Sequence, residues 1–387
     1  MATLTGFHLI DSLARIQPDA WDLLLPQTPS APPCVRHAYL SALETSGCVG
    51  RDTGWLPRHA TLWSEGKLVA AMPLYLKTHS WGEYVFDWAW ARAYQQHGLD
   101  YYPKWLAAIP FTPIPGPRVL GQTPDLRRQL VTKVQSLATD SGLSSLHVLF
   151  PSDDDLTLLQ DVGLPLRHGV QFHWENVDDD ARPYANFEAF LASLNHDKRK
   201  KIRQERRRAA EHGLSIRWLD GHTATLADWA FLYRCYANTY ALHRSTPYLN
   251  RDFFQRLAQD LPDNVSLLIA AHNDVAVACA YFLRDEEALY GRYWGSLRQL
   301  PFLHFELCYY QAIDFCIHHG LRRFEGGAQG EHKLARGLLP IKTHSAHWIA
   351  DPRFRAAVAD FLGHERNQMA FYLDELSEHA PYRAPND

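Results

Sequence analysis

The sequence predicts two α/β domains of similar topology, each a mixed β-sheet flanked by helices. Two β-hairpins of the same design begin at His59 and at Ser266. Each is followed by an amphipathic helix that ends at a glycine and leads into a short strand. A chain of 387 residues is long enough for two domains with separate cores. An order of elements that occurs twice indicates a duplicated unit, and chance similarity between two ordinary α/β units is the alternative.

The two hairpins show the same alternation of apolar residues on either side of a short turn. The first covers 59–77, with its turn at Glu65-Gly66, and the second covers 266–284, with its turn at Asn273-Asp274. The helices that follow end at Gly142 and at Gly320. Glycine adopts the left-handed conformation after a helix at little cost, so both positions predict a helix end.

The boundary between the two domains is predicted near 165–175, where GVQFHWENVD is typical of a strand and a polar turn follows. This gives an N-terminal domain of 1–168 and a C-terminal domain of 169–387. The last 45 or so residues predict a further strand, HSAHWIA, and a helix from about Asp351 to His379. This tail can complete either sheet.

Composition excludes several classes of protein. With 46% hydrophobic and 21% charged residues, the chain is neither disordered nor a coiled coil nor a collagen-like fibre. The start of the sequence does not have the pattern of a signal peptide, and no apolar run reaches about 18–20 residues, so we expect a cytoplasmic protein without a membrane span. Six cysteines without a CxxC pair predict neither disulfides nor zinc, and we expect no metal and no permanently bound cofactor.

A strongly basic helix is predicted after Asn195, a suitable N-cap, and before Gly213. Between Lys198 and Arg208 it carries eight basic residues and one acid, Glu205, although the whole chain has a net charge of −4. A solvated helix face is one interpretation. Because like charges four residues apart oppose helix formation, a polyanionic partner such as tRNA, a nucleotide diphosphate or an anionic membrane is the other.

A glycine-rich segment at 324–340, FEGGAQGEHKLARGLLP, follows a predicted strand end. Its glycines allow a loop that approaches a ligand closely and directs backbone N–H groups at an anion. It lacks the Walker A pattern. Side chains able to do chemistry surround the glycines, which favours a site over a solvent-exposed turn. These side chains include Glu325, Gln329, His332, Lys333 and Arg336.

Two further segments are candidates to line a site. Arg292, Tyr293 and Trp294 lie between two glycines, on a strand end or turn before a helix that carries Glu306. Aromatic residues at such a point belong to a core more often than to a ligand site, whereas an arginine between glycines and aromatics suits a ligand better. PFTPIPGPR, at 110–118, is too rich in proline for a central strand and predicts a rigid extended loop.

These segments resemble the Fem family of aminoacyl-tRNA-dependent transferases, in its bacterial FemAB-like branch. The duplicated unit resembles two tandem Gcn5-related N-acetyltransferase (GNAT) folds. The similar segments span most of 170–350, and the PIPGPR loop resembles one in the first domain of the family. They are KRKKIRQERRRAAEHGLSIRW, YLNRDFFQRL, LYGRYWGS and GLRRFEGGAQGEHKLARGLLP with the following SAHWI.

The resemblance implies transfer of an acyl or aminoacyl group from an activated carrier to an amine. In the peptidoglycan-branching members the carrier is aminoacyl-tRNA. Those members have a Phe-Lys pair before a glycine-containing turn, where this chain has His332-Lys333 and Gly337. Lysine there would stabilise the anionic tetrahedral intermediate or a phosphate. The chain lacks both the coiled-coil arm of some Fem proteins and the usual GNAT pyrophosphate loop, so aminoacyl-tRNA and acyl-CoA or an acyl carrier remain alternative donors.

We expect direct attack by the amine without an acyl-enzyme, because no cysteine lies in the glycine-rich segment. Lys333, His332 and Glu325 are the predicted catalytic residues, with Glu325 or His332 as the proton acceptor. The basic helix is expected to flank the same cleft as Lys333. The alternative of another class is a non-catalytic polyanion-binding protein, and the sequence leaves the acceptor amine and oligomeric state open. Predicted substrate- or carrier-binding residues are Gly327, Gln329, Gly330, Arg336, Arg292, Tyr293, Trp294, Glu306, Lys198, Arg199 and Arg203.

Overall fold

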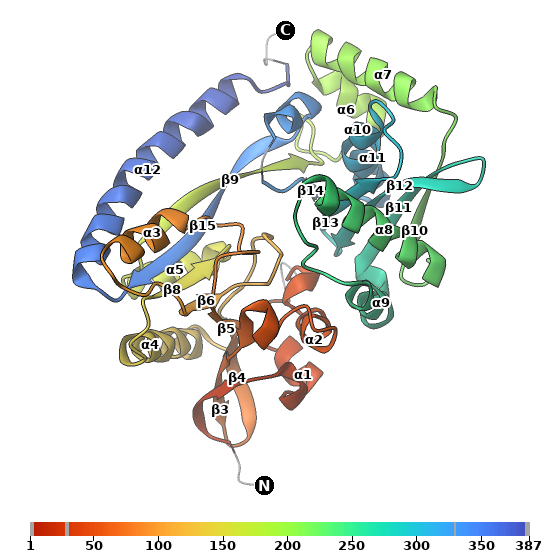
Figure 1. The fold of residues 1–387 in the computed structure, drawn as a ribbon. Helices are drawn as coiled ribbons and strands as arrows, with labels where there is room; N and C mark the ends of the chain where they lie inside the picture. Colours follow the sequence, from red (N-terminus) through yellow and green to blue (C-terminus); the bar gives the residue numbers. More distant parts are fainter. Residues whose placement is uncertain (1–3, 28–30, 329, 384–387) are drawn as a thin grey trace. The chain divides into compact units, whose positions relative to one another are not determined.

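The computed structural model describes residues 4–27, 31–328 and 330–383. The chain forms two compact units (Figure 1). The first unit comprises Met1–Gly169 and Thr343–Ala370, and the second comprises Val170–Lys342 and Phe371–Asp387. The tail from Thr343 onward therefore contributes to both units. From the sequence, this tail is expected in the second domain, and which of the two sheets it completes is left open. The limits of the functional domains remain a prediction.

The first unit contains a small antiparallel sheet and a mixed set of strands. The small sheet has the order β1-β3-β4-β7, and the mixed set has the order β15-β8-β6-β5-β2, in which only β6 and β8 are parallel to each other. The predicted hairpin is confirmed as β3 and β4, with positive φ at Glu65 and Gly66. The strands are β1 (Gly6–Ile10), β2 (Trp55–Pro57), β3 (His59–Ser64), β4 (Lys67–Met72), β5 (Leu74–Lys77), β6 (Lys104–Ala107), β7 (Leu120–Gly121), β8 (Ser145–Leu149) and β15 (Leu339–Ile349), the last of which begins in the second unit.

The second unit has strands in the order β10-β11-β12-β13-β14-β9. Here β13 and β14 are parallel to each other and the other neighbours are antiparallel. The second predicted hairpin is confirmed as β11 and β12, with positive φ at Asn273 and Asp274. The strands are β9 (Leu166–Glu175), which begins in the first unit, β10 (Ser215–Asp220), β11 (Val265–His272), β12 (Val275–Arg284), β13 (Ala288–Ser296) and β14 (Arg323–Glu325).

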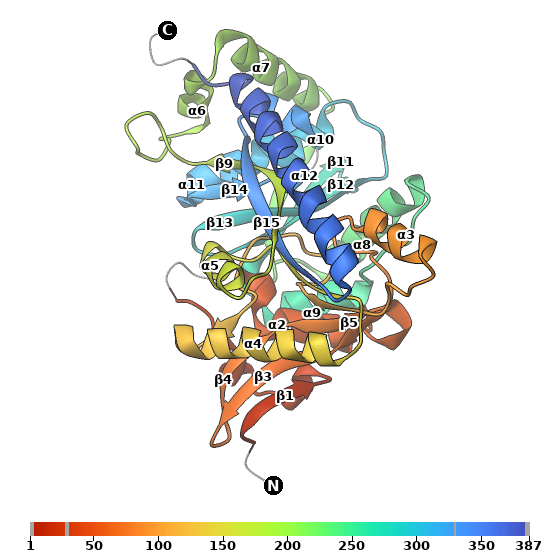
Figure 2. The same ribbon diagram turned by 90° about the vertical axis from the view of Figure 1, so that its left-hand side faces the viewer.

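Helices pack on both faces of β12 and β13, as Figures 1 and 2 show for α8, α9 and α11. Tyr281 and Tyr293 contact aromatic side chains of α8 and α9, whereas Phe282, next along β12, faces the core shared with α11. Because side chains alternate along a strand, the two sets of helices cover opposite faces. The helices are α1 (Pro18–Asp22), α2 (His37–Thr45), α3 (Trp88–Gln96), α4 (Pro124–Asp140), α5 (Asp153–Asp161), α6 (Phe187–Ser193), α7 (His196–Ala210), α8 (Leu226–Leu242), α9 (Arg251–Asp260), α10 (Leu303–Phe305), α11 (Gln311–His319) and α12 (Pro352–Glu378).

The duplication is visible in the strand pairing. In the first unit β5 pairs antiparallel with β6, and β6 pairs parallel with β8, which follows α4. In the second unit β12, β13 and β14 repeat this pattern, with α10 and α11 before β14. Gly142 and Gly320, the predicted helix ends, both have φ of 68°. The mixed α/β class with helix-flanked mixed sheets is therefore confirmed.

A buried network of charged side chains in the first unit surrounds Lys104, which we call the Lys104 network. The Lys104 ammonium, with no exposed surface, donates to Ser80 Oγ (3.0 Å), Glu83 Oε2 (2.8 Å) and Asp87 Oδ2. The network continues through the Tyr101 hydroxyl, which donates to Asp87 and contacts His147 Nε2. Because an unpaired buried charge is very costly, the network fixes the loop before α3 to the sheet.

The described residues contain no helix long and apolar enough to cross a membrane. Within those same ranges, no group of three or more His, Cys, Asp or Glu side chains is placed to hold a metal ion.

Candidate functional site

The glycine-rich segment continues the pairing between β14 and β9. Gly326 N donates to Phe172 O (2.8 Å), and Phe172 N donates to Gly327 O (3.1 Å). A Cβ atom on Gly326 would lie 2.4 Å from Leu338 and 2.9 Å from Phe172 O, so only glycine fits. Gly327 and Gly330 have φ of 74° and 96°, which favours glycine at both. A glycine-dependent turn therefore follows the strand end, and its predicted approach to a ligand stays a prediction.

Lys333 holds this turn together. Its ammonium donates to the carbonyl oxygens of Gly326 (2.7 Å), Gly327 (3.3 Å) and Ala328 (2.9 Å). The side chain is 6% exposed, and burial lowers the pKa of Lys333 to about 8. Because the three N–H donors of a lysine are all engaged, this geometry makes Lys333 a group that shapes the loop. Its role toward a reaction intermediate stays a prediction.

Arg336 joins the glycine-rich segment to the basic helix. Its Nη2 donates to both carboxylate oxygens of Glu205 at 2.9 Å, and its Nη1 donates to His332 O (2.6 Å). The guanidinium lies 3.5 Å from the centre of the Phe305 ring, and Tyr310 donates its hydroxyl to Glu205. Glu205, the one acid of the basic run, is therefore the residue that anchors α7 to this segment.

The basic helix forms as predicted, as α7. Asn195 caps it by accepting from Lys198 N (3.0 Å), and Ile202 and Ala209 are buried on its inner face. Arg206 on the same face donates to both oxygens of the buried Glu306 (3.2 and 3.1 Å). The helix thus lies next to the segment that carries Lys333. Figures 1 and 2 show it beside α6 and α10.

The outer face of α7 exposes cations. Arg203, one of its exposed side chains, forms a surface ion pair with Glu188 (2.6 Å). Lys198 and Arg199 are half-buried, and Lys198 lines a surface hollow at the start of the helix. The exposed basic residues are Lys200, Lys201, Arg203, Arg207 and Arg208.

A π-helical turn, η5 (Glu306–Tyr310), lies between α10 and α11, where the sequence predicted an amphipathic helix. From this turn, Tyr309 Oη lies 3.0 Å from His332 Nε2 of the 3-10 helix η6 (Glu331–Arg336), and Tyr310 donates its hydroxyl to Glu205 of α7. His304, which the sequence analysis missed, packs against Trp294 and Tyr309, and burial lowers its pKa to about 4. Such turns are rare in proteins as a whole. Where they do occur, they are often at functional sites.

Arg292 occupies a β-bulge in β13. Tyr281 pairs with Tyr293 and Phe282 pairs with Gly291, so Arg292 is the extra residue. The segment lies in the C-terminal half of β13 and not in a turn, and its role toward a ligand stays a prediction. Bulges redirect side chains and are common beside active sites. Tyr293 packs among aromatic residues, and Trp294 is half-buried against the core of the second unit.

Glu325, the last residue of β14, is buried and pairs in register with His173 of β9. Glu325 Oε1 accepts from Arg323 Nε (2.9 Å), and its Oε2 lies 3.8 Å from His173 Nε2. The sequence analysis missed His173, because its position opposite Glu325 depends on strand register. Gln329, a predicted binding residue, lies outside the described residues.

In the first unit, the proline-rich loop follows β6 of the parallel strand pair that corresponds to β13 and β14. This pairing ends at Ala107 and Val148, and the proline-rich loop then runs beside β8, where Gly116 forms a parallel bridge with Pro151. Arg118, with no exposed surface, fixes this loop. It donates to the carbonyl oxygens of Leu149 (2.9 Å), Gly116 (3.0 Å) and Ile114 (2.7 Å). The segment is a loop, as predicted, and these hydrogen bonds hold it in place.

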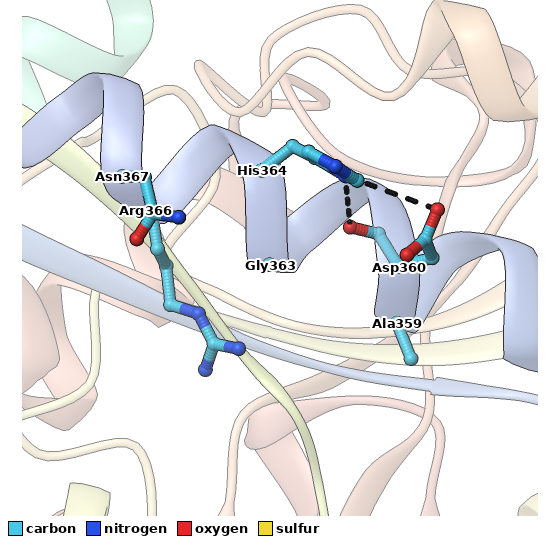
Figure 3. A pocket seen from close by; sticks show the side chains of 6 residues that line it. All are labelled: Ala359, Asp360, Gly363, His364, Arg366 and Asn367. Atoms are coloured by element: carbon cyan, nitrogen blue, oxygen red, sulfur yellow. Dashed lines mark hydrogen bonds and ion pairs between the residues drawn. The ribbon is translucent and has the colours of Figure 1, made fainter.

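Figure 3 shows a hollow in the first unit formed by one face of α12. His364 Nδ1 lies 3.0 Å from Asp360 O, within one turn of the same helix. None of the predicted site residues lines this hollow. Its lining residues are Ala359, Asp360, Gly363, His364, Arg366 and Asn367.

A hairpin that leads into a parallel strand pair is formed twice in one chain, once in each unit. The chain belongs to the FemAB-like family, whose model, described as peptidoglycan biosynthesis/recognition, matches residues 12–384. This membership confirms the predicted class, an acyl- or aminoacyltransferase.

Solved structures share the fold at low identity. The C-terminal domain of a protein described as a lysylphosphatidylglycerol synthetase from Agrobacterium fabrum is 11% identical, with 92% of this chain and 97% of that chain covered and a TM-score of 0.54. L-PGS from Bacillus licheniformis is also 11% identical, with 84% and 95% covered and a TM-score of 0.50. FemX is 11% identical, with 89% and 98% covered and a TM-score of 0.49. No curated protein matches the chain in sequence.

Proposed function

We propose that the protein transfers an aminoacyl group from aminoacyl-tRNA to an amine, with the tRNA bound along the outer face of α7. One observation carries this proposal. Glu205 and Arg206 turn inward to bind Arg336 and Glu306, so the anchoring charges of α7 are separate from its outward ones. The outer face is left with cations next to the segment that contains Lys333.

Electrostatics favours a polyanion on this surface. Five exposed basic side chains on one helix repel one another, and a phosphate backbone offsets that repulsion while it releases counterions. Because Arg336 and Glu306 fix the helix from beneath, this surface is already ordered before a carrier binds. A preordered site loses less entropy on binding.

The chemistry is attack of an amine on the carbonyl carbon of an ester. The loop shaped by Lys333 is the proposed site of the tetrahedral intermediate, since its backbone is held in one conformation. The buried cysteines support attack without an acyl-enzyme. Burial raises the pKa of the Cys308 thiol well above its usual range, and a protonated thiol is a poor nucleophile.

Acyl-CoA is the second candidate donor. The observation that favours it is the bulge at Arg292, two residues beyond the end of the parallel pairing between β13 and β14. A guanidinium there suits a phosphate group of a compact carrier.

The test is binding and transfer by the full chain with unfractionated tRNA charged with radiolabelled amino acids. The double variant Arg203→Glu/Arg207→Glu should bind tRNA at least about tenfold more weakly than the wild type. The dependence of its binding constant on salt concentration should correspond to about two fewer phosphate contacts. The control, Lys67→Glu/Lys133→Glu, makes the same change of charge at exposed positions of the first unit and should bind like the wild type. Equal binding by both variants contradicts the tRNA surface.

A parallel thermal-shift series with CoA thioesters separates the two donors. A shift with a CoA thioester and none with charged tRNA would replace tRNA by CoA. Tight tRNA binding without transfer to any amine would instead favour the non-catalytic polyanion-binding protein.

A further inference from the structure

His173 lies beside the glycine-rich turn and opposite Glu325. It follows Phe172, the residue whose backbone pairs with both Gly326 and Gly327. The side chains of His173 and Glu325 are 7% and 6% exposed. The register of β9 and β14 thus places an imidazole and a carboxylate together at the start of the turn that Lys333 shapes.

The neighbours of His173 determine which ring nitrogen carries the hydrogen. His173 Nε2 lies 3.3 Å from Gln171 Oε1 and 3.8 Å from Glu325 Oε2. Because an amide oxygen accepts hydrogen bonds, the contact with Gln171 favours a neutral ring that carries its hydrogen on Nε2 and keeps the lone pair on Nδ1. Glu325 Oε2 has no hydrogen-bond partner among the described residues, which leaves it available to move closer to the ring.

We propose that His173 is the general base of the transfer reaction, with Glu325 as the group that orients its ring. This inference rests on the proposed function, and it reassigns Glu325 from proton acceptor to positioning residue. Glu325 Oε1 already accepts from Arg323, and the other ring candidate, His332, has its Nε2 hydrogen-bonded to Tyr309. A base oriented by a buried carboxylate is a recurrent catalytic arrangement.

The proton that leaves the amine is passed through His173 to the leaving oxygen. As the acceptor nitrogen bonds to the acyl carbon, one of its protons passes to His173 Nδ1, and the resulting imidazolium is stabilised by Glu325. The bond between the acyl carbon and the carrier oxygen then breaks. The same proton passes to that oxygen, so the products are an amide and the carrier hydroxyl, and His173 is neutral again.

The charges around His173 suit this role. Desolvation lowers its pKa, Glu325 raises it, and Arg323 and Lys333 lower it further, so the pKa of His173 lies below its usual value and the ring is neutral at pH 7. Glu175 follows on the same strand as a further carboxylate. The imidazole is therefore unprotonated at the start of the reaction.

The first test is spectroscopic and needs no substrate. Long-range 1H–15N spectra of the full chain, labelled at histidine, identify the His173 ring by comparison with His173→Gln. We expect the neutral Nε2–H form at pH 7, and a lower pKa of the ring in Glu325→Gln because the carboxylate no longer favours the imidazolium. An Nδ1–H tautomer or an imidazolium at pH 7 would overturn the proposal.

The second test is transfer from the donor established for the wild type. His173→Gln should lower kcat by about 10²–10⁴-fold, with KM for the donor unchanged, and should remove the acid limb of the pH profile. Glu325→Gln should retain more activity than His173→Gln and shift that limb to lower pH. His318→Gln, which changes an exposed histidine of the same unit, should match the wild type.

These readouts separate the two proposals. Transfer by folded His173→Gln at the wild-type rate removes the base and leaves the transferase function intact. Absence of transfer by the wild type from every donor removes the proposed function, and with it the proton-acceptor role, even if the tautomer is as expected.

Discussion

Replacement of Glu205 by Gln tests how α7 is held against the glycine-rich segment. Glu205 and Arg336 are 5% and 3% exposed, and Glu205 accepts from Arg336 and from Tyr310. The substitution keeps the shape of the side chain but leaves the guanidinium buried without a counter-charge. Breaking a buried ion pair costs about 3–5 kcal/mol. Because glutamine still accepts one hydrogen bond, we expect a loss of about 3 kcal/mol in the unfolding free energy of the second unit.

Hydrogen exchange across a urea series, read by mass spectrometry, measures this loss for α7 separately from the first unit. Glu188→Gln is the matched control. Its pair with Arg203 is exposed, so its loss should be below about 1 kcal/mol. The double variant Glu205→Leu/Arg336→Met should lower the unfolding free energy by less than Glu205→Gln does, because it leaves no unpaired charge buried. A loss below 1 kcal/mol for Glu205→Gln would refute the anchoring role.

Three further predictions concern buried groups. Lys104→Met should lower the unfolding free energy of the first unit by about 3–5 kcal/mol, because it leaves two carboxylates of the Lys104 network without their ammonium partner. Urea denaturation measures this loss. A loss below about 1 kcal/mol would show that the network does not stabilise the first unit. Lys333→Ala should reduce transfer far more than stability and should speed amide exchange at 326–328, and wild-type turnover would remove its role. Desolvation lowers the pKa of His147 to about 3 and that of its neighbour His347 well below the usual value. Both rings are neutral in the folded state and bind protons on unfolding. Their contribution to the unfolding free energy is therefore fully present above pH 6.5. It should fall by up to about 2.7 kcal/mol per pH unit as the pH drops toward 3, and urea midpoints that do not change between pH 7 and 5 would contradict this.

Local signals predicted much of the fold. The turns at Glu65-Gly66 and Asn273-Asp274, the cap at Asn195 and the glycine at 320 depend on neighbours in sequence, and the structure has each of them. The order of these elements was enough to predict the duplication.

The site was predicted only in part, because its contacts join distant residues. Glu205 was visible as the one acid in a basic run, but its inward orientation depends on Arg336, which lies 131 residues away. His173 faces Glu325 only through strand register, and a bulge at Arg292 cannot be inferred from alternation within one strand. The contact between Tyr309 of the π-helical turn and His332 likewise joins residues of two different elements.

The central claim is that the outer face of α7 and the glycine-rich segment bind one carrier together. Hydrogen exchange of the full chain with and without charged tRNA measures both segments in one experiment. We predict slower exchange at 198–210 and at 326–337 in the same titration, with the same midpoint. Protection confined to the first unit, or protection of α7 without the glycine-rich segment, would contradict the claim.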